Sequence, residues 1–147
     1  MVTIVFSLFN PMVSEAKPNW KFIDTARYGV VLVDTENMRY YKSNRNIVVF
    51  WSKLQLSPDG KKEIINIAKK AKDYNKKWIK LSYYIALQQA NLATRESAIT
   101  HMFLYDDNDE LLTSSSTSPH YSPIIPGSVD EKFLECILEQ ERLGRVK

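Results

Sequence analysis

Apolar and polar residues alternate along the first third of the chain with a period of two, which is typical of β-strands. Residues 19–24 (NWKFID) alternate in this way, and residues 28–34 (YGVVLVD) are almost continuously apolar, as in a strand covered on both faces. The strongest strand pattern is 46–56 (NIVVFWSKLQL), which follows a short extended stretch at 38–41 and a polar turn. The last two segments therefore predict a β-hairpin.

A period of three to four residues replaces this alternation after Leu56 and predicts a helix over 61–72. Ser57 is a suitable N-cap, and Pro58 fits the first helical position. The helix would bury one narrow apolar stripe, composed of Ile64, Ile67, Ala68 and Ala71.

Three further segments, 78–89, 96–105 and 110–114, are rich in aromatic and β-branched residues and predict strands. The connections between them are too short for parallel crossovers, so we expect an antiparallel meander. The Ser/Thr-rich stretch 114–119 is predicted to be a surface loop.

A second helix is predicted over 128–143. Ser128 and Glu131 have the spacing of a capping box, and Gly144 is a suitable residue to end the helix. Its apolar face would consist of Val129, Phe133, Leu134, Ile137 and Leu138. The whole pattern predicts one α+β domain over 17–147. It has an antiparallel sheet of about six strands, the C-terminal helix packed on one face, and the other helix inserted between strands.

Residues 2–9 (VTIVFSLF) form an apolar run that is too short to span a bilayer. Small residues follow at Ser14 and Ala16, as signal peptidase requires, so residues 1–16 are interpreted as a signal peptide. No Lys or Arg precedes the run, so the signal is incomplete, and a strand over 3–8 is the alternative. Export predicts a secreted, periplasmic or cell-surface protein, whereas the alternative predicts a cytosolic interaction module.

Charge adds one candidate binding surface. The net charge of +3 is too small to indicate nucleic acid, but residues 61–80 hold eight lysines against Glu63 and Asp73. The C-terminal third is acidic, so the folded molecule is expected to separate its charges. The candidate polyanion-binding residues are Lys69, Lys70, Lys72, Lys76 and Lys77. The alternative is a solvated helix face.

Residues capable of catalysis or metal binding are few and widely spaced. His101 and His120 lack the spacing of metal ligands, and Cys136 is the single cysteine. The acidic run 106–110 lacks the spacing of a calcium loop and is interpreted as a hairpin turn. We therefore predict no catalytic residues, no metal site and no cofactor, and hence a protein that is not an enzyme.

The order of these segments resembles the surface-adhesin protein E family of bacterial exported proteins. The resemblance covers most of the chain from Asn19 to Cys136. After a signal-like start and the Trp20 strand, the matching motifs are 39–41 (RYY), 47–53 (IVVFWSK), 105–106 (YD) at a turn, and 125–128 (IPGS) before the C-terminal helix. The resemblance implies an antiparallel sheet with that helix on one face. It also implies a non-enzymatic role at the cell surface, with host extracellular proteins or another envelope protein as partners.

Two positions depart from the family pattern. The resemblance implies a disulfide from the C-terminal helix to the strand near 89–92, but Cys136 has no second cysteine to pair with. Asp109 stands where the family turn has glycine. The helix is then expected to be held by packing of Phe133, Ile137 and Leu138. A structural or envelope-associated domain of unknown ligand, or a homodimer through an exposed sheet edge, is the alternative function.

Overall fold

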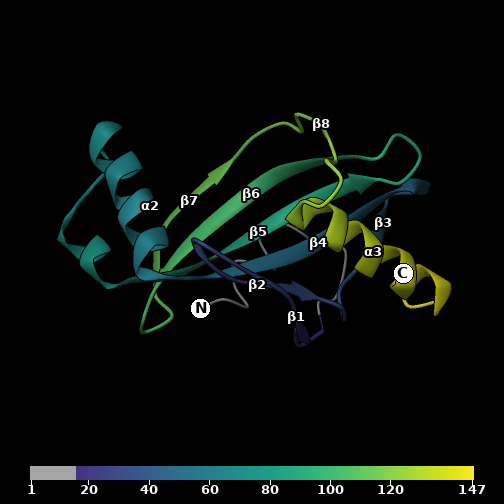
Figure 1. Cartoon of the computed structure of the whole chain (residues 1–147), viewed down its shortest axis with the longest axis horizontal. Coiled ribbons are helices and arrows are strands. Elements are labelled where there is room, and N and C mark those ends of the chain that lie inside the picture. The colour runs from purple at the N-terminus through teal and green to yellow at the C-terminus, as the bar shows by residue number, and fades with distance from the viewer. Residues whose placement is uncertain (1–15) are drawn as a thin grey trace.

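The computed structural model describes residues 16–147, which form one antiparallel sheet and two α-helices (Figure 1). The sheet order is β1-β2-β4-β5-β6-β7, with β3 paired to β4 and β8 paired to β6. The strands are β1 (Trp20–Ala26), β2 (Gly29–Asp34), β3 (Arg39–Tyr41), β4 (Asn44–Leu56), β5 (Leu81–Asn91), β6 (Glu96–Asp106), β7 (Leu111–Ser116) and β8 (Ser122–Pro123). The helices are α2 (Pro58–Lys70), the 3₁₀ helix η1 (Lys76–Lys80) and α3 (Val129–Arg142).

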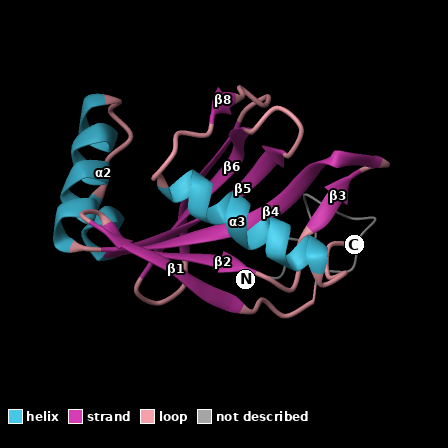
Figure 2. Cartoon of the chain, turned by 45° about the vertical axis from the view of Figure 1, so that its right-hand side comes forward, coloured by secondary structure: helices cyan, strands magenta, loops and turns pink. Residues whose placement is uncertain are grey.

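This architecture confirms the predicted α+β class, the antiparallel sheet and both helices. The six strands of the main path correspond to the predicted number, and the short β3 and β8 bring the described total to eight. Figure 2 shows α3 lying across one face of the sheet, whereas α2 stands at one end of it. No helix within residues 16–147 is long and apolar enough to cross a membrane.

Alternation along β4 sorts its side chains onto the two faces, as the sequence predicts. Val48 and Phe50 belong to the cluster under α3, whereas Val49 and Trp51 belong to a second cluster on the opposite face. Because every second residue of a strand points to the same side, one thirteen-residue strand contributes to both cores.

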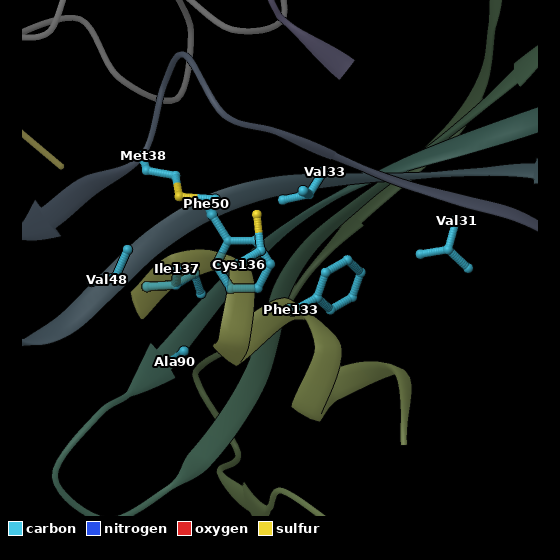
Figure 3. Close-up of a cluster of buried hydrophobic side chains, with 9 residues drawn as sticks. All are labelled: Val31, Val33, Met38, Val48, Phe50, Ala90, Phe133, Cys136 and Ile137. Carbon is cyan, nitrogen blue, oxygen red and sulfur yellow. The ribbon is translucent and has the colours of Figure 1, made fainter. Parts of the chain in front are cut away.

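The C-terminal helix is held by three buried side chains, Phe133, Cys136 and Ile137 (Figure 3). They pack against buried residues of three strands, β2, β4 and β5, and of the β2–β3 connection, and the Phe133 and Phe50 ring centroids lie 5.4 Å apart. Leu138 was expected in this face but is 41% exposed, whereas Leu134 is 2% exposed. The correction is geometric: the helix rotates so that Cys136 rather than Leu138 faces the sheet.

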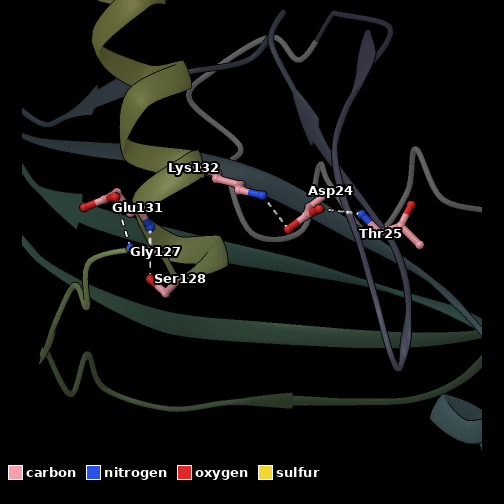
Figure 4. Close-up of polar contacts among 6 residues, drawn as sticks. All are labelled: Asp24, Thr25, Gly127, Ser128, Glu131 and Lys132. Atoms are coloured by element: carbon pink, nitrogen blue, oxygen red, sulfur yellow. Dashed lines mark hydrogen bonds and ion pairs between the residues drawn. The ribbon is translucent and has the colours of Figure 1, made fainter.

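Both ends of α3 carry the predicted caps, and Figure 4 shows the N-terminal one. The Ser128 Oγ accepts a hydrogen bond of 3.2 Å from the Glu131 N–H. Glu131 Oε1 accepts from the Gly127 N–H at 3.1 Å, one residue before the position that a capping box predicts. At the other end Gly144 adopts φ of 70°, and its N–H and that of Arg145 bond to the carbonyls of Glu141 and Gln140. This is a Schellman motif, which satisfies two of the otherwise unbonded helix carbonyls.

The inserted helix α2 begins at Pro58, the first helical position that Ser57 as N-cap predicts, and so starts before the predicted range 61–72. It ends at Lys70 instead of Lys72. Ser57 is the N-cap, and its Oγ accepts from the Gly60 N–H at 3.1 Å. Gly60 lies against the β1–β2 turn, where a Cβ would come within 2.1 Å of the Tyr28 carbonyl oxygen. The helix start can therefore pack on the sheet only with glycine at this position.

Two further sequence expectations are wrong. The predicted strand 78–89 begins only at Leu81, because Lys76–Lys80 form η1, which buries Trp78 against Leu56 and Ala68. The predicted loop 114–119 begins only after Ser116, because Ser115 and Ser116 pair with β6. In both cases tertiary packing overrides the local composition.

Candidate functional site

A groove of about 440 Å³ opens on the α3 side of the sheet, beside the N-terminal end of α3. We call it the α3-side groove. Its floor and wall are mainly apolar and include Val31, Leu54, Ala98 and Phe133. Its remaining lining residues are Ala26, Tyr28, Ser52, Lys53, Tyr84, Gln88, Ser97, Ile99, His120, Ser122, Val129 and Asp130. A volume of this size with a mostly apolar lining is typical of binding pockets.

Four polar side chains of this groove form two hydrogen-bonded pairs. Gln88 Nε2 donates to Ser52 Oγ at 2.5 Å, and both side chains are buried. Ser97 Oγ donates to Asp130 Oδ2 at 3.3 Å, in the first turn of α3. A buried hydrogen-bonded pair rigidifies the floor without leaving unsatisfied groups, so the groove presents a fixed shape.

Tyr84 adds a hydroxyl to the groove wall. Burial raises its pKa, and the neighbouring Asp130 carboxylate raises it further. The phenol therefore stays protonated at neutral pH and can donate a hydrogen bond. His120, predicted to be a solvated loop residue, is exposed and lies at the rim of this groove.

The five candidate polyanion-binding lysines are all exposed, at the C-terminal end of α2 and in η1. The Lys69 Nζ lies 4.9 Å from the centre of the Tyr74 ring. The ion pairs among residues 16–147 involve none of these five side chains. Their role in polyanion binding stays a prediction.

The acidic turn 107–110 lies next to η1, because the Asp107 N–H bonds to the Lys80 carbonyl at 3.0 Å. The expected separation of charge is therefore incomplete: Lys76 and Lys77 share their end of the sheet with carboxylates. Figure 1 shows α2 rising away from this turn, so its C-terminal lysines are further from the carboxylates.

The turn itself has the hydrogen bonding of a polar hairpin turn, as predicted. Asp106 is buried, and its Oδ1 accepts from the N–H groups of Asn108 and Glu110. Asp109 adopts φ of 61°, the left-handed conformation that favours the glycine of the family motif. Its Oδ1 accepts from the Tyr83 hydroxyl at 2.7 Å, and burial and this contact raise the pKa of Tyr83.

The remaining chemistry-bearing residues do not converge. His101 stacks beside Phe103 on the face opposite α3, and burial lowers its pKa, whereas His120 lies on the α3 side. Cys136 is free and buried, and burial raises the pKa of its thiol. Within the described part of the chain, no group of three or more His, Cys, Asp or Glu side chains is placed to hold a metal ion.

Sequence reasoning missed the α3-side groove. Its polar members Gln88, Ser97 and Asp130 belong to β5, β6 and α3, and no motif joins them. The one available signal was the pair Gln88–Gln89 inside an otherwise apolar strand, because a buried amide there needs a partner.

No protein-family model and no curated protein sequence matches this chain. Two solved structures of Haemophilus influenzae protein E are similar in fold. Crystal form II of that protein has a TM-score of 0.52 at 12% identity, covering 86% of this chain and 97% of that chain. Protein E from non-typeable Haemophilus influenzae has a TM-score of 0.55 at 11% identity, covering 92% of this chain and 86% of that chain. The chain therefore has a protein E-like fold.

Proposed function

We propose that this protein is an exported or cell-surface bacterial binding protein, an adhesin-like module that catalyses no reaction. One observation carries the proposal: the protein E-like fold extends over 86% or more of both chains in each comparison. The resemblance of the sequence motifs to the surface-adhesin protein E family supports the same conclusion. The proposed partners are host extracellular proteins or another envelope protein.

The α3-side groove is a suitable contact surface for such a partner. Its apolar floor offers burial for one or two side chains, and Asp130, Ser97 and Tyr84 provide polar groups at its wall. Apolar centres with polar surroundings are typical of protein-binding surfaces. Burial raises the pKa of the Cys136 thiol, which favours the protonated form over the nucleophilic thiolate.

The test is binding of the purified protein to a panel of immobilised extracellular matrix proteins, with serum albumin as the negative control. Ile99 lines the groove and is 42% exposed, so Ile99→Glu should leave the fold intact. An unpaired carboxylate in an apolar contact should lower affinity by at least about tenfold. Ile125→Glu is the matched control, because Ile125 is 67% exposed and does not line the groove. Absence of binding to every protein in the panel would overturn the proposal.

A second candidate is an α+β interaction module that keeps its first sixteen residues. The Ala16 N–H donates to Asn37 Oδ1 at 2.8 Å, and Asn37 Nδ2 donates to the Ala16 carbonyl at 2.9 Å. Asn37 also donates to the buried Asp34 carboxylate at 2.6 Å. These contacts join Ala16 to the folded domain and favour a chain that is not cleaved there. This candidate predicts recovery from the cytosol with Met1 in place, whereas export predicts a chain that starts at Lys17.

A further inference from the structure

The strand β7 (Leu111–Ser116) is an open edge of the sheet. It pairs with β6 on one side, and within residues 16–147 no strand pairs with its other side. Its sequence, LLTSSS, has no charge and no proline, and every residue except Leu112 is exposed. The pairing register shifts at Leu112, between the Leu104–Thr113 and Tyr105–Leu111 pairs, so the regular part of the edge is 113–116. Natural proteins usually protect such edges with lysine, proline or a bulge, and these four residues have none of them, so they are a ready site for strand pairing.

The orientation of the β7 backbone follows from one hydrogen bond. The Thr117 N–H bonds to the Thr100 carbonyl of β6 at 2.9 Å. Because alternate residues of an antiparallel strand bond to opposite sides, Thr113 and Ser115 bond inward to β6. The N–H and carbonyl groups of Ser114 and Ser116 therefore point outward, where an added strand would meet them.

An apolar groove of about 320 Å³ lies between this edge and α2, and we call it the α2–β7 groove. Its residues are Ile64, Ile67, Ala68, Ala71, Asp73, Trp78, Met102, Leu104, Thr113, Ser114 and Ser115. Figure 1 shows α2 and β7 beside one another at the same end of the sheet. Ile67 is 58% exposed, so the α2 wall of the groove presents aliphatic surface to solvent. Since every second side chain of a strand points to the same face, a strand on β7 would direct side chains into this groove.

Three lysines adjoin the lining residues of this groove in the sequence. Lys69 follows Ala68, and Lys70 and Lys72 flank Ala71. All three are exposed, and none takes part in an ion pair among residues 16–147. Asp73 is the one carboxylate in the lining. The groove therefore suits a ligand that combines an aliphatic group with negative charge.

We propose that β7 binds an extended acidic segment of a partner protein by strand addition. Main-chain hydrogen bonds to Ser114 and Ser116 hold the segment, an aliphatic side chain enters the α2–β7 groove, and carboxylates face Lys69, Lys70 and Lys72. The inference rests on the proposed binding function and names the chemistry of the partner.

The first test is fluorescence anisotropy of the full chain with a fluorescein-labelled octapeptide, the valine–glutamate peptide. It carries valine and glutamate in turn at its odd positions and serine at its even positions, so that both side chains point to the face of the sheet that α2 covers. The controls are the valine–lysine peptide and a valine–glutamate peptide that carries N-methyl groups along one edge. Both should bind at least about tenfold more weakly, because one reverses the charge and the other removes the strand donors. Equal binding of the N-methylated peptide overturns strand addition, and this comparison leaves the protein unchanged.

Protein variants then locate the site. Ser114→Pro removes an outward N–H without removing a bond to β6, so it should abolish peptide binding, whereas Ser114→Ala should retain it. The double change Lys70→Glu, Lys72→Glu should weaken binding by about tenfold or more, and more so at low salt. Lys61→Glu, Lys62→Glu at the other end of α2 is the charge-matched control and should have a smaller effect.

The outcomes separate this inference from the proposed function. Binding to a matrix protein without binding of the valine–glutamate peptide would overturn the β7 site and leave the proposed function standing. The site would also be overturned if the peptide bound equally well to the Ser114→Pro variant and to the Lys70→Glu, Lys72→Glu variant. Peptide binding by a protein that is found intact in the cytosol would support the site and contradict export.

Discussion

Lys72 directly follows Ala71, the C-cap of α2, and adopts φ of 61°. The Asp73 and Lys72 N–H groups bond to the carbonyls of Ala68 and Lys69, so the helix ends in a Schellman motif like that of α3. At α3 the left-handed residue is Gly144, but at α2 it is a lysine, which carries a steric cost that glycine avoids.

Lys72→Gly should therefore raise the free energy of unfolding by about 0.5–1 kcal/mol, because it relieves the strain of the left-handed conformation. Denaturant unfolding of the purified protein measures the effect. Lys62→Gly, at an exposed position inside the helix, is the matched control and should lower stability by about 1 kcal/mol. A loss of stability from both changes would contradict the strained helix end.

Burial makes Cys136 an unreactive thiol. It is 7% exposed, and burial raises the pKa of its thiol, with a smaller raising effect from Glu139 and an opposing one from Lys21. Because the thiolate is the nucleophile, the rate of alkylation follows the thiolate fraction.

Iodoacetamide should accordingly modify the folded protein much more slowly at pH 8 than the chain unfolded in urea. The rate for the folded protein should still be rising with pH above the ordinary thiol pKa, because the raised pKa moves the titration upward. Mass spectrometry of the alkylated Cys136 peptide over time gives both rates. Equal rates would show that the side chain is accessible and its thiolate readily formed.

The helix α3 depends on its buried face, and the exposed residues beside it matter little. Phe133 is 5% exposed and contacts Phe50, whereas Leu138 is 41% exposed. Phe133→Ala should lower the free energy of unfolding by about 3–5 kcal/mol through lost burial and the remaining cavity. Leu138→Ala should change it by about 0.5 kcal/mol or less. Losses of similar size from both changes would mean that Leu138 is buried with Phe133, as the sequence alone predicts.

One ion pair connects α3 to the strand β1. The Lys132 Nζ lies 2.7 Å from Asp24 Oδ2, and this contact, followed by the Thr25 N–H, lowers the pKa of Asp24. A lowered pKa means that the stabilisation is present above the ordinary carboxyl pKa and is lost as the pH falls through the folded-state value.

The difference in melting temperature between the native protein and Asp24→Asn should therefore be small but measurable at pH 7 and vanish in strong acid. The size is modest because both partners are partly exposed. Thermal unfolding followed by circular dichroism across this pH range measures it. A difference that grows with falling pH would have the wrong sign for a lowered pKa.

Local chemistry predicts the elements better than their ends. Ser57 and Ser128 are short-range caps, so both helices could be placed from the sequence. Trp78 has the character of a strand residue, but packing against Leu56 and Ala68 places it in η1. Pairing with β6 extends β7 through serines that favour loops. The α3-side and α2–β7 grooves could not be predicted, because each joins distant segments that carry no shared motif.

At the scale of the whole molecule, the sheet and α3 form a protein E-like fold with two grooves that the sequence does not reveal. The predicted signal peptide, residues 1–16, lies outside the described residues except for Ala16. Asp34 Oδ1 accepts from the Asn19 N–H at 2.9 Å, so a chain that begins at Lys17 keeps an anchor for β1. Export is therefore compatible with retention of the sheet.

The most direct test of an exported binding protein is the mass of its native N-terminal peptide, measured separately in the cytosolic, envelope and medium fractions of the source cells. The account predicts that the protein is recovered from the envelope or the medium and that its first residue is Lys17. Recovery from the cytosol with Met1 and residues 2–16 intact would contradict it.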